Sequence, residues 1–289
     1  MKITILIPVF NDWQSLFKLL ENINSEVSNL DHDFSLIIVN DASTEVRPEL
    51  SYSFENFSSI KIINMKENRG HARCNASGLK YIFEKEMFDH VIPMDGDGED
   101  RPEEIKNFID NLNYSEGQTI VGDRVKRSEG LFFKSCYFFH KILTYSFTGK
   151  SIKFGNYTCL PKKVVEKMIN EKATWSSFSG SLAKVTNTRL AIPSERGSRY
   201  FGPSKMSFKN LLVHSLSIIS VFKYNVLVRS VLFLLVYFFI IFDNISNITL
   251  IPFYLIILFN LMTFYISNRE NIEELNNSSK NINSIEIIK

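Results

Sequence analysis

The first 125 residues alternate short apolar runs with longer stretches in which apolar positions recur every three or four residues. Short runs rich in Ile and Val predict buried strands, and the helical spacing predicts amphipathic helices. Strands are expected at residues 3–10, 34–41, 60–65, 90–95 and 119–124, and helices at residues 13–27, 70–86 and 101–112. This alternation predicts a doubly wound α/β domain around a mostly parallel, Rossmann-like sheet.

Two long apolar runs follow, at residues 226–242 and 248–266, separated by the short polar stretch DNISN. As helices they would be about 25 and 29 Å long, close to the thickness of a bilayer core. They predict a C-terminal transmembrane hairpin of two helices. A pair of buried core helices is the alternative.

The charges around this hairpin predict its orientation. Basic residues flank its outer ends, whereas the loop between the runs carries only Asp243. By the positive-inside rule both long flanks are then cytoplasmic, which predicts a multi-pass protein of the cell (inner) membrane. The N-terminal stretch MKITILIPVFND is a poor signal peptide, because its apolar part is short and Pro8 interrupts it. Three widely spaced cysteines fit a reducing compartment, each as a small buried hydrophobe.

The remaining segments are less regular. Residues 131–147 are strongly aromatic and predict either a core helix or a helix lying in the membrane interface. The expected organisation is a catalytic domain at 1–205, an interfacial helix at 206–225, two transmembrane helices at 226–267 and a polar cytoplasmic tail at 268–289. The tail is expected to be disordered or a loose helix.

Candidate chemistry gathers where the predicted strands end. A formal net charge of +2 excludes a polycation of the kind that binds nucleic acid. Polar pairs follow the first three strands, and the stretch MDGDGEDRPEEI follows the fourth, with Asp95, Asp97, Glu99 and Asp100 in six positions. Ligands of doubly wound sheets bind at these carboxyl ends.

Four carboxylates this close repel one another, so a bound cation would offset their repulsion. An Asp-x-Asp pair supplies two hard oxygen ligands to Mg²⁺ or Mn²⁺ and leaves coordination positions for phosphate oxygens. Such a metal also neutralises a leaving diphosphate. The pair alone is a weak signal, since it also arises on surface turns. Its position after a buried strand and before a helix strengthens it.

Several motifs together resemble family 2 glycosyltransferases of the GT-A fold. They are TILIPVFND, VNDAST, ENRGHARCNASGL, MDGDGEDRPEEI, VGDRVKR and RGSRYFGPSKMSFKNLLVHSLSIISVF, and they cover roughly residues 3–225. The resemblance is strongest to dolichyl-phosphate mannose synthase and bacterial polyprenyl-phosphate glycosyltransferases. It implies a nucleotide-sugar-dependent enzyme of the hexosyltransferase type with a GT-A catalytic domain.

The resemblance also implies roles for individual residues. Nucleotide and substrate binding falls to Pro8, Phe10, Asp12, Asp41, Asn68, Gly70, Arg73, Asp95, Gly96, Arg124 and Ser204. The implied metal ligands are Asp95, Asp97 and Glu99, and the implied catalytic residues are Asp95, Asp97, Arg199 and Lys205. Turn or helix-cap duty is the alternative for Asp12 and Asp41. For the basic loop at 196–206, which also carries Arg196, the alternative is a surface loop that meets anionic headgroups.

The implied reaction is a single displacement that moves a sugar from a UDP- or GDP-linked donor to a polyprenyl (undecaprenyl or dolichyl) phosphate, with inversion, for cell-surface glycan synthesis. Two positions depart from the family pattern. Asn40 replaces the first residue of an Asp-Asp pair, and Asn156 stands where relatives often carry Asp. An amide is no general base, and Asp100, Asp123 and Glu195 are only candidates for one. A lipid phosphate is already anionic and needs none.

Three alternatives stay open from the sequence. The first is an enzyme that extends a lipid-linked or surface polysaccharide through a hydroxyl acceptor. The second is a nucleotidyltransferase, and the third is a non-catalytic scaffold that binds nucleotide sugar in the membrane. A nucleotidyltransferase would normally carry a Gly-rich phosphate loop after the first strand, which IPVFNDWQSL lacks. The expected partners are the nucleotide sugar, the lipid-linked acceptor and membrane lipids, without nucleic acid, and a homo-oligomer is compatible with the pattern.

Overall fold

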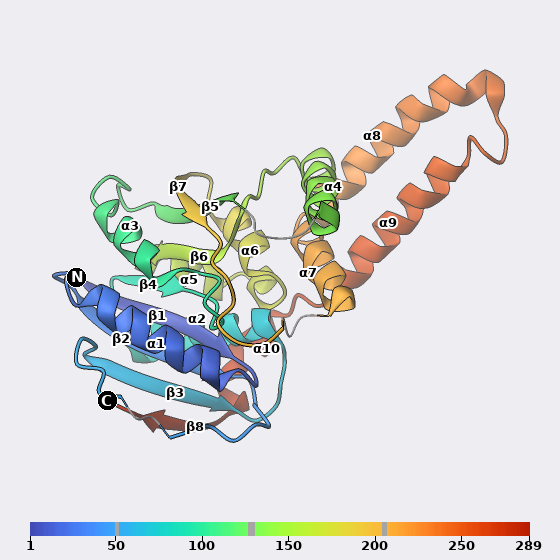
Figure 1. The fold of residues 1–289 in the computed structure, drawn as a ribbon. Coiled ribbons are helices and arrows are strands. Elements are labelled where there is room, and N and C mark those ends of the chain that lie inside the picture. Colours follow the sequence, from blue (N-terminus) through green and yellow to red (C-terminus); the bar gives the residue numbers. More distant parts are fainter. Residues whose placement is uncertain (50–51, 127–130, 204–206) are drawn as a thin grey trace. The chain divides into compact units, whose positions relative to one another are not determined.

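The computed structural model describes residues 1–49, 52–126, 131–203 and 207–289 and contains two compact units (Figure 1). The first unit comprises Met1–Ser128, Lys153–Lys205 and Asn271–Lys289, and the second comprises Glu129–Ile152 and Met206–Glu270. The first unit holds the sheet, and the second holds the long apolar helices.

The first unit is built on an eight-stranded sheet with the order β7-β5-β6-β4-β1-β2-β3-β8. The strands are β1 (Lys2–Val9), β2 (Asp33–Asn40), β3 (Ser59–Met65), β4 (His90–Pro93), β5 (Thr119–Lys126), β6 (Phe154–Pro161), β7 (Arg189–Glu195) and β8 (Ile282–Ile287). The central strands β4, β1, β2 and β3 are parallel, whereas β6 and β8 run antiparallel to their neighbours. All five predicted strands are present, and β6, β7 and β8 are additional.

Helices cover both faces of this sheet (Figure 1). They are α1 (Trp13–Val27), α2 (His71–Lys85), α3 (Ile105–Asp110), α5 (Lys162–Ile169), α6 (Phe178–Val185) and α10 (Ile272–Asn276), with 3-10 turns η1 (Pro102–Glu104), η2 (Lys172–Trp175) and η4 (Ser278–Asn281). α1 packs with α3 on one face, and α2 packs with α5, α6 and α10 on the other. The three predicted helices are confirmed, and α1 has the predicted bounds.

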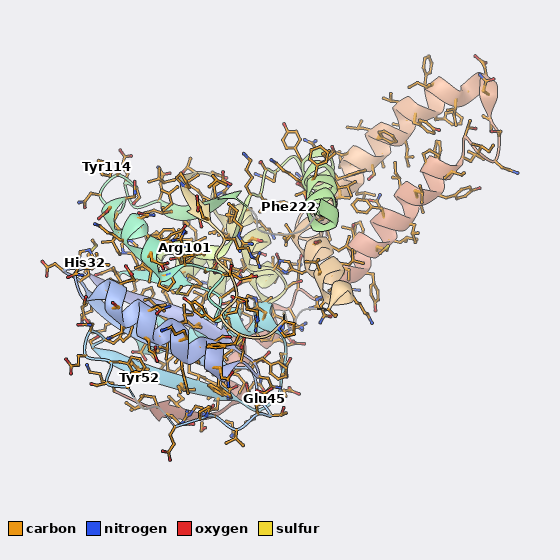
Figure 2. The ribbon with its side chains drawn as sticks, in the orientation of Figure 1. His32, Glu45, Tyr52, Arg101, Tyr114 and Phe222 are labelled. Carbon is orange, nitrogen blue, oxygen red and sulfur yellow. The ribbon has the colours of Figure 1, made fainter. Side chains whose placement is uncertain are left out.

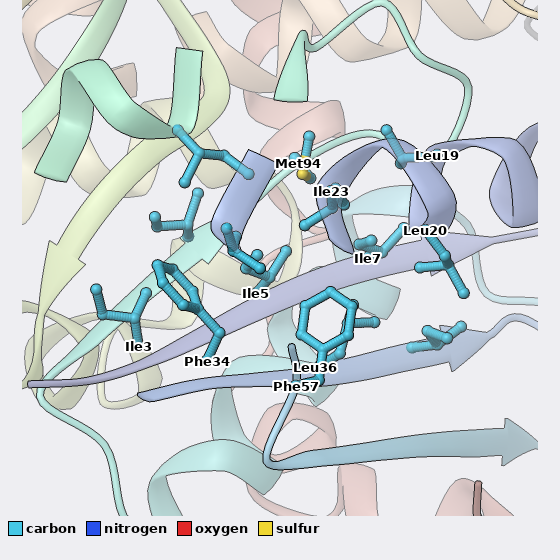
Figure 3. Packing of buried hydrophobic residues seen from close by; sticks show 14 of the residues in the cluster. Ile3, Ile5, Ile7, Leu19, Leu20, Ile23, Phe34, Leu36, Phe57 and Met94 are labelled. Atoms are coloured by element: carbon cyan, nitrogen blue, oxygen red, sulfur yellow. The ribbon is translucent and has the colours of Figure 1, made fainter. Parts of the chain in front are cut away.

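Alternation along β1 sorts its side chains between the two layers. Ile3, Ile5 and Ile7 belong to the fully buried cluster under α1, which Figure 3 shows. Leu6 points to the other face, where Gly78 of α2 lets the helix approach so closely that an added Cβ would lie 2.4 Å from Leu6 Cδ1. Each such aliphatic side chain contributes about 1.5–3 kcal/mol by its burial. The packing thus fixes the first turn of α2 beside the strand ends.

The C-terminal tail is ordered, so the prediction of a disordered tail or loose helix is wrong. β8 pairs antiparallel with β3, with Ile63 opposite Ile285 and Asn64 opposite Ser284. The edge of β3 offers unpaired backbone groups, and the tail satisfies them. Leu275 of α10 is fully buried against the first unit.

The second unit contains a helical hairpin. Its elements are α4 (Leu131–Thr148), α7 (Phe208–Ser220), α8 (Lys223–Ile241), η3 (Phe242–Asn244) and α9 (Ile251–Ser267). α8 and α9 are about 29 and 26 Å long. Asn260 Nδ2 donates to Ser230 Oγ at 2.8 Å between them, and Tyr237 Oη donates to the carbonyl of Thr249 at 3.0 Å. The helical stretches that contain α8 and α9 are long and apolar enough to cross a membrane. Their side chains project outward along the hairpin (Figure 2).

Helix α4 groups with the second unit, although the sequence placed it within the first 205 residues. Arg229 of α8 donates to the carbonyl of Ser146 at 3.0 Å, and Phe147 packs on Phe259 of α9 with ring centroids 4.9 Å apart. The interpretation of α4 as a core helix of the sheet domain is therefore wrong. The last turn of α4 contacts the apolar helices α8 and α9 instead of a sheet face. Of the cysteines, Cys74 and Cys159 are buried thiols as predicted, and the side chain of Cys136 lies outside the described residues.

Candidate functional site

The site lies at the carboxyl ends of the parallel strands of the first unit. Its centre is the carboxylate turn, residues 95–100, which connects β4 to η1. The N-terminus of α2, the end of β1 and strand β6 contribute side chains around it. The loop after β7, residues 196–201, closes the site and is called the cationic loop.

Asp95 is held by neutral and cationic donors from two other elements. Its Oδ1 lies 3.0 Å from Nε2 of His71, the first residue of α2, and accepts from Nδ2 of Asn156 of β6 at 3.2 Å. Burial would raise the pKa of Asp95, but His71, Arg124 and Asn156 hold that pKa well below its usual range. Asp95 therefore stays ionised across the physiological range.

Burial lowers the pKa of His71, but the neighbouring carboxylates, Asp95 first, raise it further, so its net pKa lies above the ordinary value. The imidazolium form is thus favoured in the site, where it lies beside Asp95.

The carboxylate of Asp97 is paired with a cation from another element, the cationic loop. Its Oδ1 accepts from the backbone N–H of Glu99 at 3.0 Å, and its Oδ2 accepts from Arg199 Nη1 of the cationic loop at 2.9 Å. The other Nη of Arg199 binds Asp12 at the end of β1. Burial and the charge of Asp95 raise the pKa of Asp97 to about 6, although Arg199 opposes the shift.

Asp100 is the most deeply buried carboxylate of the turn, with 4% of its surface exposed. Its Oδ2 accepts from the backbone N–H of Asp95 at 2.9 Å, and its Oδ1 lies 3.7 Å from Arg124 Nη2 of β5. Burial and the charge of Asp95 raise the pKa of Asp100 to about 7. Full ionisation of the turn is therefore disfavoured by burial and by like charge.

The cationic loop is docked on the carboxylate turn by its backbone. Gly197 N donates to the carbonyl of Glu99 at 2.8 Å, and Tyr200 N donates to the carbonyl of Asp97 at 2.9 Å. Gly98 has φ +89°, and a Cβ there would lie 2.4 Å from Cε2 of Tyr200. Only glycine fits this left-handed position under the tyrosine ring. The two segments therefore form one closed wall of the site.

The predicted nucleotide side is arranged around Asp41 at the end of β2. Asp41 Oδ1 accepts from the N–H of Arg69 at 3.0 Å, and Oδ2 accepts from the N–H of Gly70 at 2.9 Å. Burial raises the pKa of Asp41, and these two amides oppose the shift. Asp41 thus has the turn duty that the sequence left as an alternative, because it holds the two residues that precede α2, whose N-cap Gly70 has no side-chain cap.

The structure brings most of the other predicted binding residues to this edge. Pro8 is buried, and its carbonyl would lie 3.0 Å from a Cβ on Gly96, while Phe10 and Asn68 are exposed. The guanidinium of Arg73 lies 5.6 Å from the ring centre of Trp175. Ser204 and Lys205 lie outside the described residues.

The two departures from the family pattern have structural roles. Asn40 donates to Asn64 Oδ1 at 2.9 Å and accepts from the N–H of Ser43 at 3.0 Å, so it ties β2 to β3. Asn156 donates to Asp95 as described above. Among the base candidates, Asp100 is buried and Glu195 lies 3.7 Å from Arg101, which is labelled in Figure 2.

The predicted three-carboxylate metal set is not assembled in the described residues, where no group of three metal-ligating side chains occurs. The carboxylate of Glu99 binds Arg196 of the cationic loop instead. Asp95 and Asp97 still fit a divalent cation, because their hard oxygens are partly accessible, at 25% and 20% exposure. Burial and the charge of Asp95 raise the pKa of Asp97 and of Asp100, and a bound cation would oppose this shift.

His71 and Tyr200 are site residues without a predicted role. His71 lies in the segment RGHAR, six residues after the end of the predicted strand at 60–65, and its place in the first turn of a helix at the binding edge was the available signal. Tyr200 had no such signal, because its contact with Gly98 depends on how the loop folds back.

The shifted pKa values predict how stability depends on pH. An unfolded Asp titrates near about 3.9, so between about pH 4 and 7 the folded protein binds more protons at Asp97 and Asp100 than the unfolded chain does. The raised pKa of His71 acts in the same direction, whereas the lowered pKa of Asp95 acts only below about pH 4. The free energy of unfolding in EDTA should therefore fall as the pH rises from 5 to 8.

Asp100→Asn should flatten this decline, because the amide keeps an acceptor for the Asp95 N–H but carries no charge. Asp110→Asn, at an exposed position on α3, is the control and should leave the slope unchanged. Denaturant unfolding of the detergent-solubilised chain at several pH values measures the slope of the free energy of unfolding against pH. An Asp100→Asn variant with the unaltered protein's slope would contradict the assignment.

Comparisons with known proteins agree with this geometry. The family model described as "Glycosyl transferase family 2" matches residues 4–170. An undecaprenyl-phosphate 4-deoxy-4-formamido-L-arabinose transferase of Salmonella choleraesuis is 28% identical over 221 residues, which cover 73% of this chain and 64% of the relative. Its counterpart in Salmonella paratyphi B matches to the same extent. The chain thus spans less than two thirds of the length of these curated relatives.

Two solved structures share the fold. S. aureus TarS in complex with UDP-GlcNAc has a TM-score of 0.51 at 12% identity and covers 80% of this chain and 70% of that chain. Glucosyl-3-phosphoglycerate synthase from Mycobacterium tuberculosis, with Mn²⁺, UDP and phosphoglyceric acid, has a TM-score of 0.56 at 10% identity and covers 78% of each chain. These likenesses confirm the predicted GT-A fold. Because the family model covers more than half of the 289 residues, the protein belongs to glycosyltransferase family 2.

Proposed function

We propose that the protein is a membrane-bound inverting glycosyltransferase that moves a sugar from a nucleotide sugar to a polyprenyl phosphate. The observation that carries the proposal is the carboxylate turn closed by the cationic loop at the strand ends of a family 2 domain. The similarity to transferases named for undecaprenyl phosphate supports the acceptor class.

The nucleotide would lie between the ends of β1 and β2 and the start of α2. Phe10 is 39% exposed there and offers an aromatic face, while Asp12 offers a carboxylate oxygen to ribose hydroxyls or base N–H groups. Asp41 is 5% exposed and accepts from two backbone amides, so its proposed role is to hold the loop that borders the nucleotide. Gly70 has φ +90°, and an added Cβ would meet no atom within 4 Å, so the backbone is open to a close ligand. A UDP- or GDP-linked donor fits this arrangement.

Asp95 and Asp97 are the residues that would hold a divalent cation, Mg²⁺ or Mn²⁺. Solved structures of the same fold contain Mn²⁺ beside nucleotide ligands, which supports a metal of this class. When bound, such an ion neutralises the charge of the leaving diphosphate. His71 and Asn156 keep Asp95 ionised and oriented for this duty.

Cations of the loop after β7 would stabilise the leaving group. Arg199 already bridges Asp97 and Asp12, so it lies where the diphosphate charge would develop. A guanidinium can exchange a carboxylate partner for phosphate oxygens with the same fork geometry. Ser204 and Lys205 are proposed to add a hydroxyl and a compact charge. This inward orientation of Arg199 favours a catalytic loop over a headgroup anchor.

The acceptor proposal follows from the chemistry of attack. A hydroxyl acceptor needs a general base, but Asn156 is an amide that donates to Asp95, and Asp100 is almost fully buried. A phosphate monoester is anionic at neutral pH and attacks without a base. The two apolar helices α8 and α9 provide the membrane setting in which a polyprenyl phosphate resides.

The direct test is a product assay with the purified full chain, undecaprenyl phosphate and a panel of UDP- and GDP-linked sugars. We expect a sugar linked to the lipid phosphate, with turnover lost in EDTA and restored by Mn²⁺ or Mg²⁺. Asp95→Ala and Asp97→Ala should nearly abolish turnover while unfolding remains cooperative, whereas Asp110→Ala should not. Sugar found on a glycan hydroxyl would replace the acceptor proposal, and full activity in EDTA would refute the metal role.

Arg199→Ala should lower turnover by roughly a hundredfold, or about 2.7 kcal/mol of barrier, because a cation at the developing charge is lost. Arg199→Lys should retain part of the activity, since it keeps the charge without the bidentate fork. Lys209→Ala removes an exposed basic residue of α7 and serves as the control. If Arg199→Ala keeps normal turnover but leaves the membrane, the loop is only a headgroup anchor.

Topology can be tested with single engineered cysteines in a Cys136→Ser background. Basic flanks predict that the first unit, including the ordered tail, is cytoplasmic and that the loop between α8 and α9 is on the far side. Ser246→Cys and Ser279→Cys both lie at exposed positions. An impermeant maleimide should label position 246 but not position 279 in intact cells, and both after lysis. Equal labelling of the two in intact cells contradicts the proposed hairpin.

A further inference from the structure

The loop between β3 and α2, residues 66–70, is held from two sides. Asp41 binds its Arg69 and Gly70 amides on one side. On the other side lies the C-terminal segment, residues 271–289. The N–H of Lys66 donates to the carbonyl of Asn281 at 2.8 Å, and Lys66 Nζ donates to that of Lys280 at 2.7 Å. The β3–α2 loop is therefore held in part by a segment that lies more than 200 residues later in the chain.

One carboxylate connects the C-terminal segment to the start of α2. Glu274 Oε2 accepts from the indole N–H of Trp175 at 2.6 Å and lies 3.6 Å from Arg69 Nη1. Its Oε1 accepts from Asn271 Nδ2 at 3.1 Å. The ring face of Trp175 contacts a second arginine, Arg73, whose guanidinium lies over the ring. Glu274 thus reaches both arginines of the α2 entry, one directly and one through the indole.

The position of Glu274 is itself fixed. Asn271 caps α10, because its Oδ1 accepts from the N–H groups of Glu273 and Glu274, each at 3.0 Å. The next residue, Leu275, is fully buried with Ala76 of α2 and with Trp175, which is 1% exposed. A helix anchored in this way presents its carboxylate at a defined place.

The β3–α2 loop is not packed solidly against the segment. A hollow of about 440 Å³ lies between them, lined by Glu67 and Arg69 on one side and by residues of the C-terminal segment, including Glu274, on the other. No residue of the carboxylate turn lines it. Because polar residues surround an open hollow, the loop depends on discrete contacts more than on packing.

We propose that Glu274 is a positioning residue for donor binding. Through Trp175 and Arg69 it holds the β3–α2 loop and the first turn of α2 in the conformation that receives the nucleotide. This inference rests on the proposed function, because Gly70 and Arg73 belong to the proposed nucleotide pocket. By this proposal the C-terminal segment, residues 271–289, contributes to nucleotide binding by the first unit.

Hydrogen exchange of the full-length, detergent-solubilised protein tests the positioning without any ligand. Glu274→Ala should speed exchange of the amides of residues 66–73 by about tenfold, with β1 and α1 unchanged. Glu274→Gln keeps an acceptor for the indole N–H and loses the charge opposite Arg69, so its effect should be intermediate. Glu273→Ala, one residue away on the same helix, is the control. Unchanged exchange in both Glu274 variants, with the fold intact, overturns the proposal.

Calorimetry with UDP and GDP in the presence of Mn²⁺ tests the consequence for the nucleotide. In Glu274→Ala the dissociation constant of the nucleotide that binds, and the KM for its sugar donor, should rise about tenfold while kcat changes less than twofold. Faster exchange with unchanged nucleotide affinity would overturn the link to donor binding. If the unaltered protein binds neither nucleotide, the proposed function fails, and the exchange result alone decides whether Glu274 positions the loop.

Discussion

The repulsion among Asp95, Asp97 and Asp100 is the constraint around which the site is built. Burial and the charge of Asp95 raise the pKa of Asp97 and of Asp100, and cations from separate elements of the fold oppose this shift. His71 approaches from α2 and Arg199 from the loop after β7. None of these partners is close in sequence, so the contacts of the turn depend on the sheet, α2 and the loop being assembled together.

The same constraint connects structure to chemistry. A site that gathers several carboxylates at one turn is suited to a divalent cation, and a cation in turn is suited to a diphosphate. Arg199 links the turn to Asp12 at the end of β1, on the proposed nucleotide side. The C-terminal segment extends this arrangement, because β8 and α10 hold the neighbouring β3–α2 loop from outside. Donor binding and leaving-group stabilisation thus share one edge of the sheet.

Local sequence patterns predicted the features that depend only on neighbouring residues, such as helix bounds and the place of the carboxylate turn. The apolar spacing of residues 13–27 gave α1 its observed bounds, and the run of carboxylates after a strand located the turn. The partnership of His71 and Asn156 with Asp95 was not predictable, because it arises from strands and helices distant in the chain. The tail was judged by its polar composition, yet β8 forms because the edge of β3 supplies unpaired backbone groups. The aromatic pattern of α4 suited two environments equally, and only its contacts distinguish them.

The proposed activity requires the carboxylate turn to bind a divalent cation together with a nucleoside diphosphate. Isothermal titration of UDP and of GDP into the full-length protein, with Mn²⁺ or with EDTA, tests it most directly. One of the two nucleotides should bind at least about tenfold more tightly with Mn²⁺, and Asp97→Asn should remove this difference. A nucleotide that binds equally tightly in EDTA and in Mn²⁺ would contradict the claim.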